Sequence, residues 1–299
     1  MSWHLKSGET RSERASTHID PASVGWTYCG LQVYDLEVGP ITVELKQTEG
    51  ILLPLTATDV HVEVQVGDES FTQVLKGRTS VFESVSDWAY LPIDSMVVIT
   101  GSVGEVALCT ARANISFPFH YEDASRVPVE LRGAGNASRQ VNNIATASSF
   151  GGAHKINVCE VLTPGGNFSS WPPHRHDGLG DCPTNNEEIY FFKIDNMSVH
   201  PSQEGYLHVY SAKESLQLVD EMVVIGNDDS YVIPHGFHGP SIAPPESTMY
   251  FLNVLAGPAE ERSMAFCDDP LHHWIRESWS DLAIDPRLPL TKNANEENL

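Results

Sequence analysis

The stretch from Trp171 to Phe192, WPPHRHDGLGDCPTNNEEIYFF, decides how this sequence is interpreted. His174 and His176 are separated by one residue, and alternate residues of a β-strand point to the same face of a sheet. Both imidazoles are therefore expected on one face. Glu188 lies in the β-forming run EEIYFF, and its neighbour Glu187 should face the opposite way. Only Glu188 of this pair is then a candidate metal ligand.

A third histidine follows in the segment Ser230 to Gly239, SYVIPHGFHG, where Pro and Gly shape a turn before His238. An isolated His-x-His pair is more often a surface or core feature than a metal site. A carboxylate and a further histidine in strand or turn context make the set more specific. Three imidazoles and one carboxylate suit Zn, Mn, Fe or Ni and leave positions open for water and substrate. The sequence thus predicts one divalent metal ion inside a β-barrel.

The rest of the chain supports an all-β fold with few short helices. Short, β-branched, alternating segments such as Val60 to Val66 and Met249 to Leu255 recur in both halves, as in antiparallel sandwiches and barrels. The polar segment Tyr121 to Ser149 is interpreted as a connector between two β-domains. His272 to Ala283 has the composition of a short helix.

The charge balance limits the classes of partner. The chain has 40 acidic and 18 basic residues, a net charge of -22, so nucleic acid and anionic membrane surfaces would be repelled. An anionic substrate would need a local positive site. The five cysteines are odd in number, far apart and without a CxxC pair, which favours a reducing cytoplasm. Neither a secretory h-region nor a membrane-length apolar run is found in the sequence.

The motifs WPPHRHD and IPHGFHGPSIAP resemble those of cupins, with two departures. Eleven residues, Asp177 to Glu187, separate His176 from the carboxylate, and only one residue lies between Gly236 and His238. Both departures match the 5-deoxy-glucuronate isomerases of myo-inositol catabolism. The runs GWTYCGLQVYDLEVG, ELRGAGNASRQVNNI and YFLNVLAG are also similar to that family, so the resemblance covers nearly the whole chain. The 4-deoxy-5-ketouronate isomerases of pectin breakdown form a sister family.

The resemblance implies a bicupin, two jelly-roll-like β-barrels. Residues 1–125 would form an N-terminal cupin-like domain without a metal set, since His61 and His120 there stand alone. Residues 126–299 would form the C-terminal cupin domain with the metal site and a C-terminal extension. The implied ligands are His174, His176, Glu188 and His238, and the implied metal is Zn, Mn or Fe.

The implied reaction converts 5-deoxy-D-glucuronate to 5-dehydro-2-deoxy-D-gluconate, an aldose–ketose isomerisation in inositol catabolism. The alternatives are the pectin-pathway isomerase, a cupin dioxygenase and a non-catalytic sugar-binding cupin. Proton transfer and hydride shift both remain open as routes. The partner is a small anionic sugar acid; a homo-oligomer is an open alternative because cupins often pair through sheet edges.

Several residues are candidates for the remaining roles. Tyr190 and Asp177 are candidate proton-transfer groups, although packing in the barrel wall is the simpler interpretation of Tyr190. Arg139, Lys155 and Arg132 are candidate partners of the substrate carboxylate, with a structural ion pair at the domain junction as the alternative. Strand alternation excludes Arg175 from the metal face. The insertion 177–187 is a candidate loop over the mouth of the site.

Overall fold

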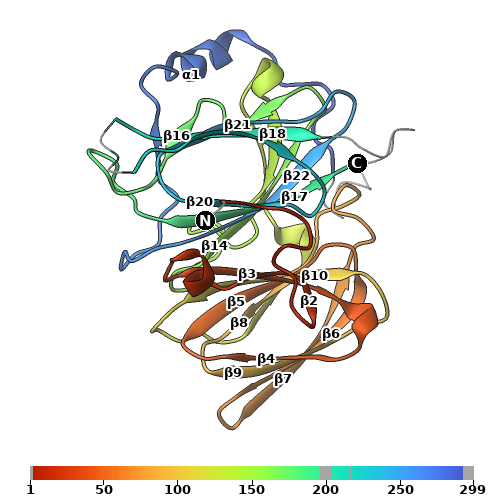
Figure 1. Ribbon diagram of the computed structural model, residues 1–299. Helices are drawn as coiled ribbons and strands as arrows, with labels where there is room; N and C mark the ends of the chain where they lie inside the picture. The colour runs from red at the N-terminus through yellow and green to blue at the C-terminus, as the bar shows by residue number, and fades with distance from the viewer. Residues whose placement is uncertain (1–2, 196–203, 214, 216, 292–299) are drawn as a thin grey trace.

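The computed structural model describes residues 3–195, 204–213, 215 and 217–291. It contains two β-barrels, one formed mainly by each half of the chain (Figure 1). Each barrel is built from two antiparallel sheets, and the larger sheet of each faces the other barrel.

The N-terminal barrel has a six-stranded and a four-stranded sheet. The larger sheet has the order β11 (His120–Glu122), β8 (Trp88–Leu91), β5 (Thr48–Pro54), β10 (Glu105–Arg112), β3 (Cys29–Asp35), β2 (Ala15–Ile19). The smaller sheet has the order β4 (Ile41–Leu45), β9 (Ser95–Thr100), β6 (Thr58–Val66), β7 (Glu69–Gly77). The predicted alternation holds in β6, where Val60, Val62 and Val64 are buried and the residues between them are exposed.

The C-terminal barrel has a seven-stranded and a six-stranded sheet. The larger sheet has the order β1 (His4–Leu5), β20 (Ser230–Ile233), β17 (Glu187–Ile194), β22 (Met249–Ala256), β14 (Asn157–Thr163), β13 (Arg139–Asn142), β12 (Val129–Arg132). The smaller sheet has the order β19 (Asp220–Ile225), β18 (Gly205–Tyr210), β21 (Phe237–Ile242), β16 (His174–Arg175), β23 (Cys267–Asp268), with β15 (Phe168–Ser169) also paired to β21.

The interpretation of residues 121–149 as a connector is wrong. β12 and β13 lie in this segment and extend the large sheet of the C-terminal barrel. All four residues of β13 are buried, three of them polar, and Gln140 and Asn142 are satisfied by hydrogen bonds to Thr291 and Glu160. A buried strand whose polar groups are paired lacks the apolar alternation that marks strands in a sequence.

The chain division expected at residues 125 and 126 falls in a single 3-10 turn, Ala124–Arg126, between β11 and β12. One element crosses it, because β1 at the start of the chain pairs with β20 of the C-terminal barrel. The predicted helix is shorter than expected: α1 spans Trp274–Ser278 and a 3-10 turn comes directly after it. Among the described residues, no helix has the length and apolar character needed to cross a membrane.

One hydrophobic core joins the two barrels. It includes Leu31 and Ile51 of the N-terminal barrel together with Val158, Phe191 and Leu252 of the C-terminal barrel. Each barrel also has its own interior core. The strands β14 and β22 are consequently buried on both faces, one toward the neighbouring barrel and one toward the interior of their own.

Candidate metal centre and its cavity

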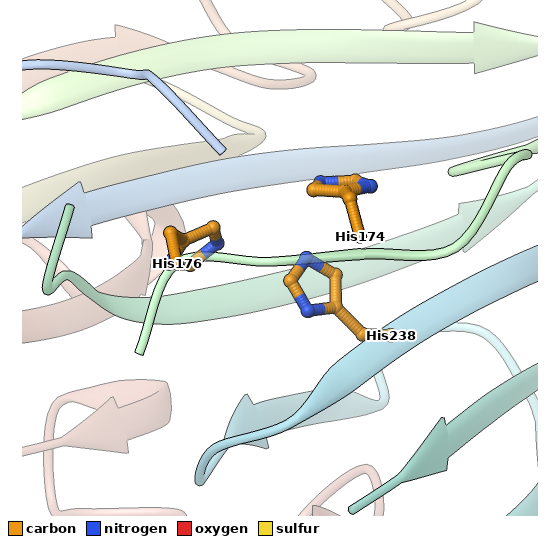
Figure 2. A group of neighbouring side chains, drawn as sticks. All are labelled: His174, His176 and His238. Carbon is orange, nitrogen blue, oxygen red and sulfur yellow. The ribbon is translucent and has the colours of Figure 1, made fainter. Parts of the chain in front are cut away.

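Three histidines converge inside the C-terminal barrel (Figure 2). β16 and β21 place His174 directly opposite His238, with ring centroids 4.3 Å apart. His176 shares their face, and one ligand nitrogen from each of the three lies within 4.8 Å of the others. The two imidazoles share a face as predicted, although β16 itself ends at Arg175.

Glu188 reaches the same point from β17. Its Oε2 atom lies 2.7 Å from His176 Nε2 and 3.0 Å from His238 Nε2, and the carboxylate is buried. The structure thus brings the four predicted ligands together. Neighbouring ligand atoms about 2.9 Å apart are expected when bonds of about 2.0–2.1 Å meet one ion at right angles. The donor set fits a divalent cation.

The surroundings favour the metal-binding protonation states of Glu188 and His174. Burial acts to raise the pKa of Glu188, but His176 and His238 outweigh it and hold that pKa well below its usual value. Burial, aided by His238, lowers the pKa of His174 well below its usual range. The Nδ1 atom of His176 lies 3.1 Å from the Asn186 carbonyl, which fixes the ring so that Nε2 faces the centre. A charged carboxylate and neutral imidazoles are the forms that bind metals.

His174, His176 and Glu188 form part of the wall of a cavity of about 200 Å³. Tyr190 lines it, and its hydroxyl lies 3.2 Å from Ser170 Oγ. Burial, together with Glu188, raises the Tyr190 pKa well above its usual value. Asn253 also lines the cavity, and its buried Oδ1 has no hydrogen-bond partner among the described residues.

Three arginines make the cavity locally positive: Arg132, Arg139 and Arg276. Arg132 binds Glu130 through two hydrogen bonds of 2.9 and 2.7 Å. Arg276 likewise holds both oxygens of Asp268. Arg139 is different, because no carboxylate of the described residues lies within ion-pair distance.

The Arg139 guanidinium is buried, and one of its NH groups donates to the Ala137 carbonyl at 2.9 Å. Burial, together with the neighbouring arginines, lowers the pKa of Arg139 to about 9. A buried cation without a counter-charge is destabilised until an anion joins it. Arg139 is therefore the arginine of the cavity best prepared to receive a substrate carboxylate.

Two candidates from the sequence do not reach the cavity. Asp177 accepts hydrogen bonds from the backbone N–H groups of Leu179 and Gly236, and so holds the loop after His176 against the turn before His238. The Lys155 ammonium donates to the carbonyls of Pro258 and Ala259 at the junction of the barrels. Each side chain has at least one backbone partner far away in the sequence, Gly236 for Asp177 and Pro258 and Ala259 for Lys155, and spacing along the chain does not reveal such contacts.

Part of the segment predicted to lie over the site, namely Asp177 and residues 185–187, lines a second cavity together with His176 and His238. No residue of 177–187 lines the cavity of about 200 Å³. Met264, Phe266 and Arg276 of the C-terminal segment line it instead, and α1 lies at the end of the molecule farthest from the N-terminal barrel (Figure 1). The exclusion of Arg175 and Glu187 from the metal face is confirmed: Arg175 packs over Phe237, and Glu187 reaches the N-terminal barrel.

A two-barrel protein with a three-histidine, one-carboxylate centre in its second barrel is the class that fold and site define. The chain belongs to the KduI/IolB family, whose model matches residues 3–275. A curated relative from Geobacillus kaustophilus, named 5-deoxy-glucuronate isomerase, is 35% identical over 281 residues, 92% of this chain and 95% of that protein. A relative of the same name from Bacillus subtilis is 35% identical over 84% of this chain and 89% of its own length.

Solved structures agree with the fold. The crystal structure of an IolB-like protein from Salmonella typhimurium superimposes with a TM-score of 0.79 at 31% identity, over 91% of this chain and 98% of that one. An oxalate decarboxylase from Lactobacillus farciminis gives a TM-score of 0.62 at 11% identity, covering 90% and 88%, and shares the fold alone. The predicted bicupin fold is confirmed, and the chain is an enzyme, an isomerase of the aldose–ketose type.

Proposed function

We propose that this protein is a metal-dependent isomerase that converts 5-deoxy-D-glucuronate to 5-dehydro-2-deoxy-D-gluconate in the breakdown of inositol. The observation that carries the proposal is one cavity lined both by His174, His176 and Glu188 of the candidate metal centre and by Arg139, which has no ion-pair partner among the described residues. The names of the most similar curated relatives support the choice of substrate. The free thiols of all five cysteines are consistent with a cytoplasmic site of action.

His174, His176, Glu188 and His238 would hold one Zn, Mn or Fe ion. Such an ion would polarise the substrate carbonyl and its neighbouring hydroxyl as a Lewis acid. The chain's own residues then have separate tasks. Arg139 binds the substrate carboxylate and orients the sugar acid, and Asn253 offers its free carbonyl oxygen to a substrate hydroxyl.

Proton movement between the two carbons needs a further group in the cavity wall. Of the two proton-transfer candidates from the sequence, Tyr190 lines the cavity and Asp177 does not. The Tyr190 hydroxyl is suited to hold a proton and donate it to a substrate oxygen. Glu130, which sequence reasoning missed, is the second carboxylate of the cavity wall besides Glu188. Arg132 donates to both oxygens of Glu130 and lowers its pKa, so this carboxylate is ionised but a weaker base than a free one.

The assignment is tested by incubating purified, metal-loaded protein with 5-deoxy-glucuronate and identifying the product. We expect reversible turnover without oxygen consumption and loss of turnover after chelation. Turnover of the pectin-derived 4-deoxy-5-ketouronate in place of 5-deoxy-glucuronate would reassign the substrate. Oxygen consumption would indicate a dioxygenase, and binding without turnover a sugar-binding module.

A matched pair of histidine variants tests the metal centre itself. His176→Ala removes one ligand, and we expect at least about a 100-fold loss of metal affinity, since losing even an outer partner of a ligand costs about 10–100-fold. His61→Ala removes an exposed histidine of β6 and should retain full metal content. Metal analysis of both dialysed proteins decides; equal metal content would exclude His176 as a ligand.

A further inference from the structure

The residue before Glu188 has an unusual set of partners. Glu187 points away from the metal face, and its carboxylate accepts three backbone N–H groups of the N-terminal barrel. The donors are Thr27, Tyr28 and Cys29, at 2.8, 2.7 and 2.8 Å. Hydrogen bonds to a charged carboxylate are roughly twice as strong as those between neutral groups. The N-terminal barrel thus binds the first residue of β17, the strand that carries the predicted metal ligand Glu188.

A second contact of this kind joins the barrels, with the carboxylate supplied by the N-terminal barrel and the N–H groups by the C-terminal barrel. Glu49 of β5 is fully buried and accepts the backbone N–H groups of His154, Lys155 and Ile156, at 2.8, 2.6 and 2.8 Å. β5 and β17, which carry the two carboxylates, occupy equivalent places in their sheets. β3 and β14 are equivalent as well, and the N–H donors lie at or just before the first residue of each. Each barrel therefore holds the beginning of a strand of the other with one carboxylate.

The two carboxylates have different neighbours in the chain. Gly50 comes directly after Glu49, whereas the ligand Glu188 comes directly after Glu187. β17 begins at Glu187, which pairs with β22 alone, and pairing with β20 starts only at Glu188. This end of the strand is therefore held by a sheet neighbour on one side only. The three N–H groups that bind Glu187 complete its anchoring.

We propose that Glu187 is a positioning residue for the metal centre, and that the N-terminal barrel acts through it. By fixing the Glu187 carboxylate, the backbone of residues 27–29 sets the position of the β17 backbone, and with it the aim of the Glu188 carboxylate at His176 and His238. This gives the N-terminal barrel, in whose described residues no metal-ligand cluster is found, a role in metal binding. The inference rests on the proposed metal centre.

The test compares Glu187→Gln with Glu49→Gln, two variants that each replace a carboxylate of an inter-barrel contact by an amide of the same size. Zn²⁺ affinity is measured by competition with a chromophoric chelator, and stability by thermal unfolding of the metal-free protein. We expect both variants to lose stability. Glu187→Gln should bind Zn²⁺ about 10-fold more weakly, within the range seen when a group that orients a ligand is removed. Glu49→Gln should keep the wild-type affinity within about 2-fold.

Glu187→Ala extends the series and should weaken Zn²⁺ binding further than the glutamine variant. Wild-type affinity in a folded Glu187→Gln protein would overturn the inference. So would an equal loss of affinity in Glu49→Gln, because general loosening between the barrels would then explain both. A wild-type protein that binds no stoichiometric Zn²⁺, Mn²⁺ or Fe²⁺ would instead overturn the proposed metal centre.

Discussion

At the scale of single residues, the metal centre and its cavity combine side chains that are close in the sequence with others from distant segments of the chain. A two-residue period is a local property, and it suffices to place His174 and His176 on one face. His238 joins them through the long-range pairing of β16 with β21, and the family resemblance implied it as a ligand. Glu130 and Arg276 enter the cavity from segments far from His176 on either side in the sequence, so only the folded chain brings them there. Asp177 does not line the cavity of about 200 Å³, and its carboxylate accepts the backbone N–H groups of Leu179 and Gly236.

A substitution of Arg139 is expected to weaken substrate binding. Arg139→Ala removes the cavity arginine that has no carboxylate partner in the described part of the chain, so the substrate carboxylate loses its charge-assisted hydrogen bonds. Such bonds contribute about 1.5–3 kcal/mol, and we expect kcat/KM to fall about 10- to 100-fold, mainly through KM. Steady-state kinetics with 5-deoxy-glucuronate measures it, and metal content should stay at the wild-type level.

Arg126→Ala is the matched control for this prediction. Arg126 forms an exposed ion pair with Glu122 in the turn between the barrels and lies outside the cavity. Its kinetics should equal those of the wild type. An unchanged KM in Arg139→Ala would remove Arg139 from the substrate site.

At the scale of elements, strands with one solvent-exposed and one buried face could be recognised in the sequence. Buried strands whose polar side chains are paired by hydrogen bonds could not. Buried apolar and exposed polar residues alternate along β6, whereas the polar residues of β13 are buried and form hydrogen bonds. β1 was missed for a different reason. It has two residues, His4 and Leu5, and is fixed by a long-range contact of His4 Nε2 with Asp229 Oδ2 at 2.9 Å.

The β1 contact predicts a pH dependence of stability. Burial acts to raise the pKa of Asp229, but hydrogen bonds from His4 and from the N–H groups of Gly226 and Ser7 outweigh it and lower that pKa. A carboxylate with a lowered folded-state pKa stabilises the fold above its unfolded pKa of about 3.9, and this contribution is lost as the pH falls through the folded-state value. Asp229→Asn should therefore unfold at a lower temperature than the wild type near neutral pH.

The difference in melting temperature between wild type and Asp229→Asn should shrink steadily below about pH 4. Thermal unfolding followed by circular dichroism from acidic to neutral pH measures it. A difference that stays constant over this range would show that shape, not charge, holds β1 in place.

At the scale of the whole molecule, the two-barrel architecture followed from the strand rhythm and the family resemblance, but the extent of contact between the barrels did not. Apolar residues on both faces of β14 and β22 are compatible with several packing arrangements in the sequence. In the structure, their second face meets the N-terminal barrel in a common core. Two barrels joined in this way are expected to unfold in one transition rather than one after the other.

A buried ion pair within this junction allows the expectation to be tested. Arg78, just after β7, binds Glu160 of β14, and both are buried. Glu160 also accepts the hydroxyl of Tyr250 at 2.9 Å and the amide of Asn142 at 3.0 Å. Glu160→Gln leaves the Arg78 charge buried without its partner, which costs about 3–5 kcal/mol in comparable pairs.

Lys76→Gln provides the control from the same part of the chain. Lys76 pairs with Asp123 at the surface, where ion pairs add little to stability, so its unfolding midpoint should not change. Urea unfolding followed by both fluorescence and far-ultraviolet circular dichroism measures each variant. Because Glu160 ties one barrel to the other, Glu160→Gln should lower the midpoint by the same amount in both signals, in a single transition. Separation into two transitions would mean that each barrel folds on its own and that the common core is not what makes the molecule one cooperative unit.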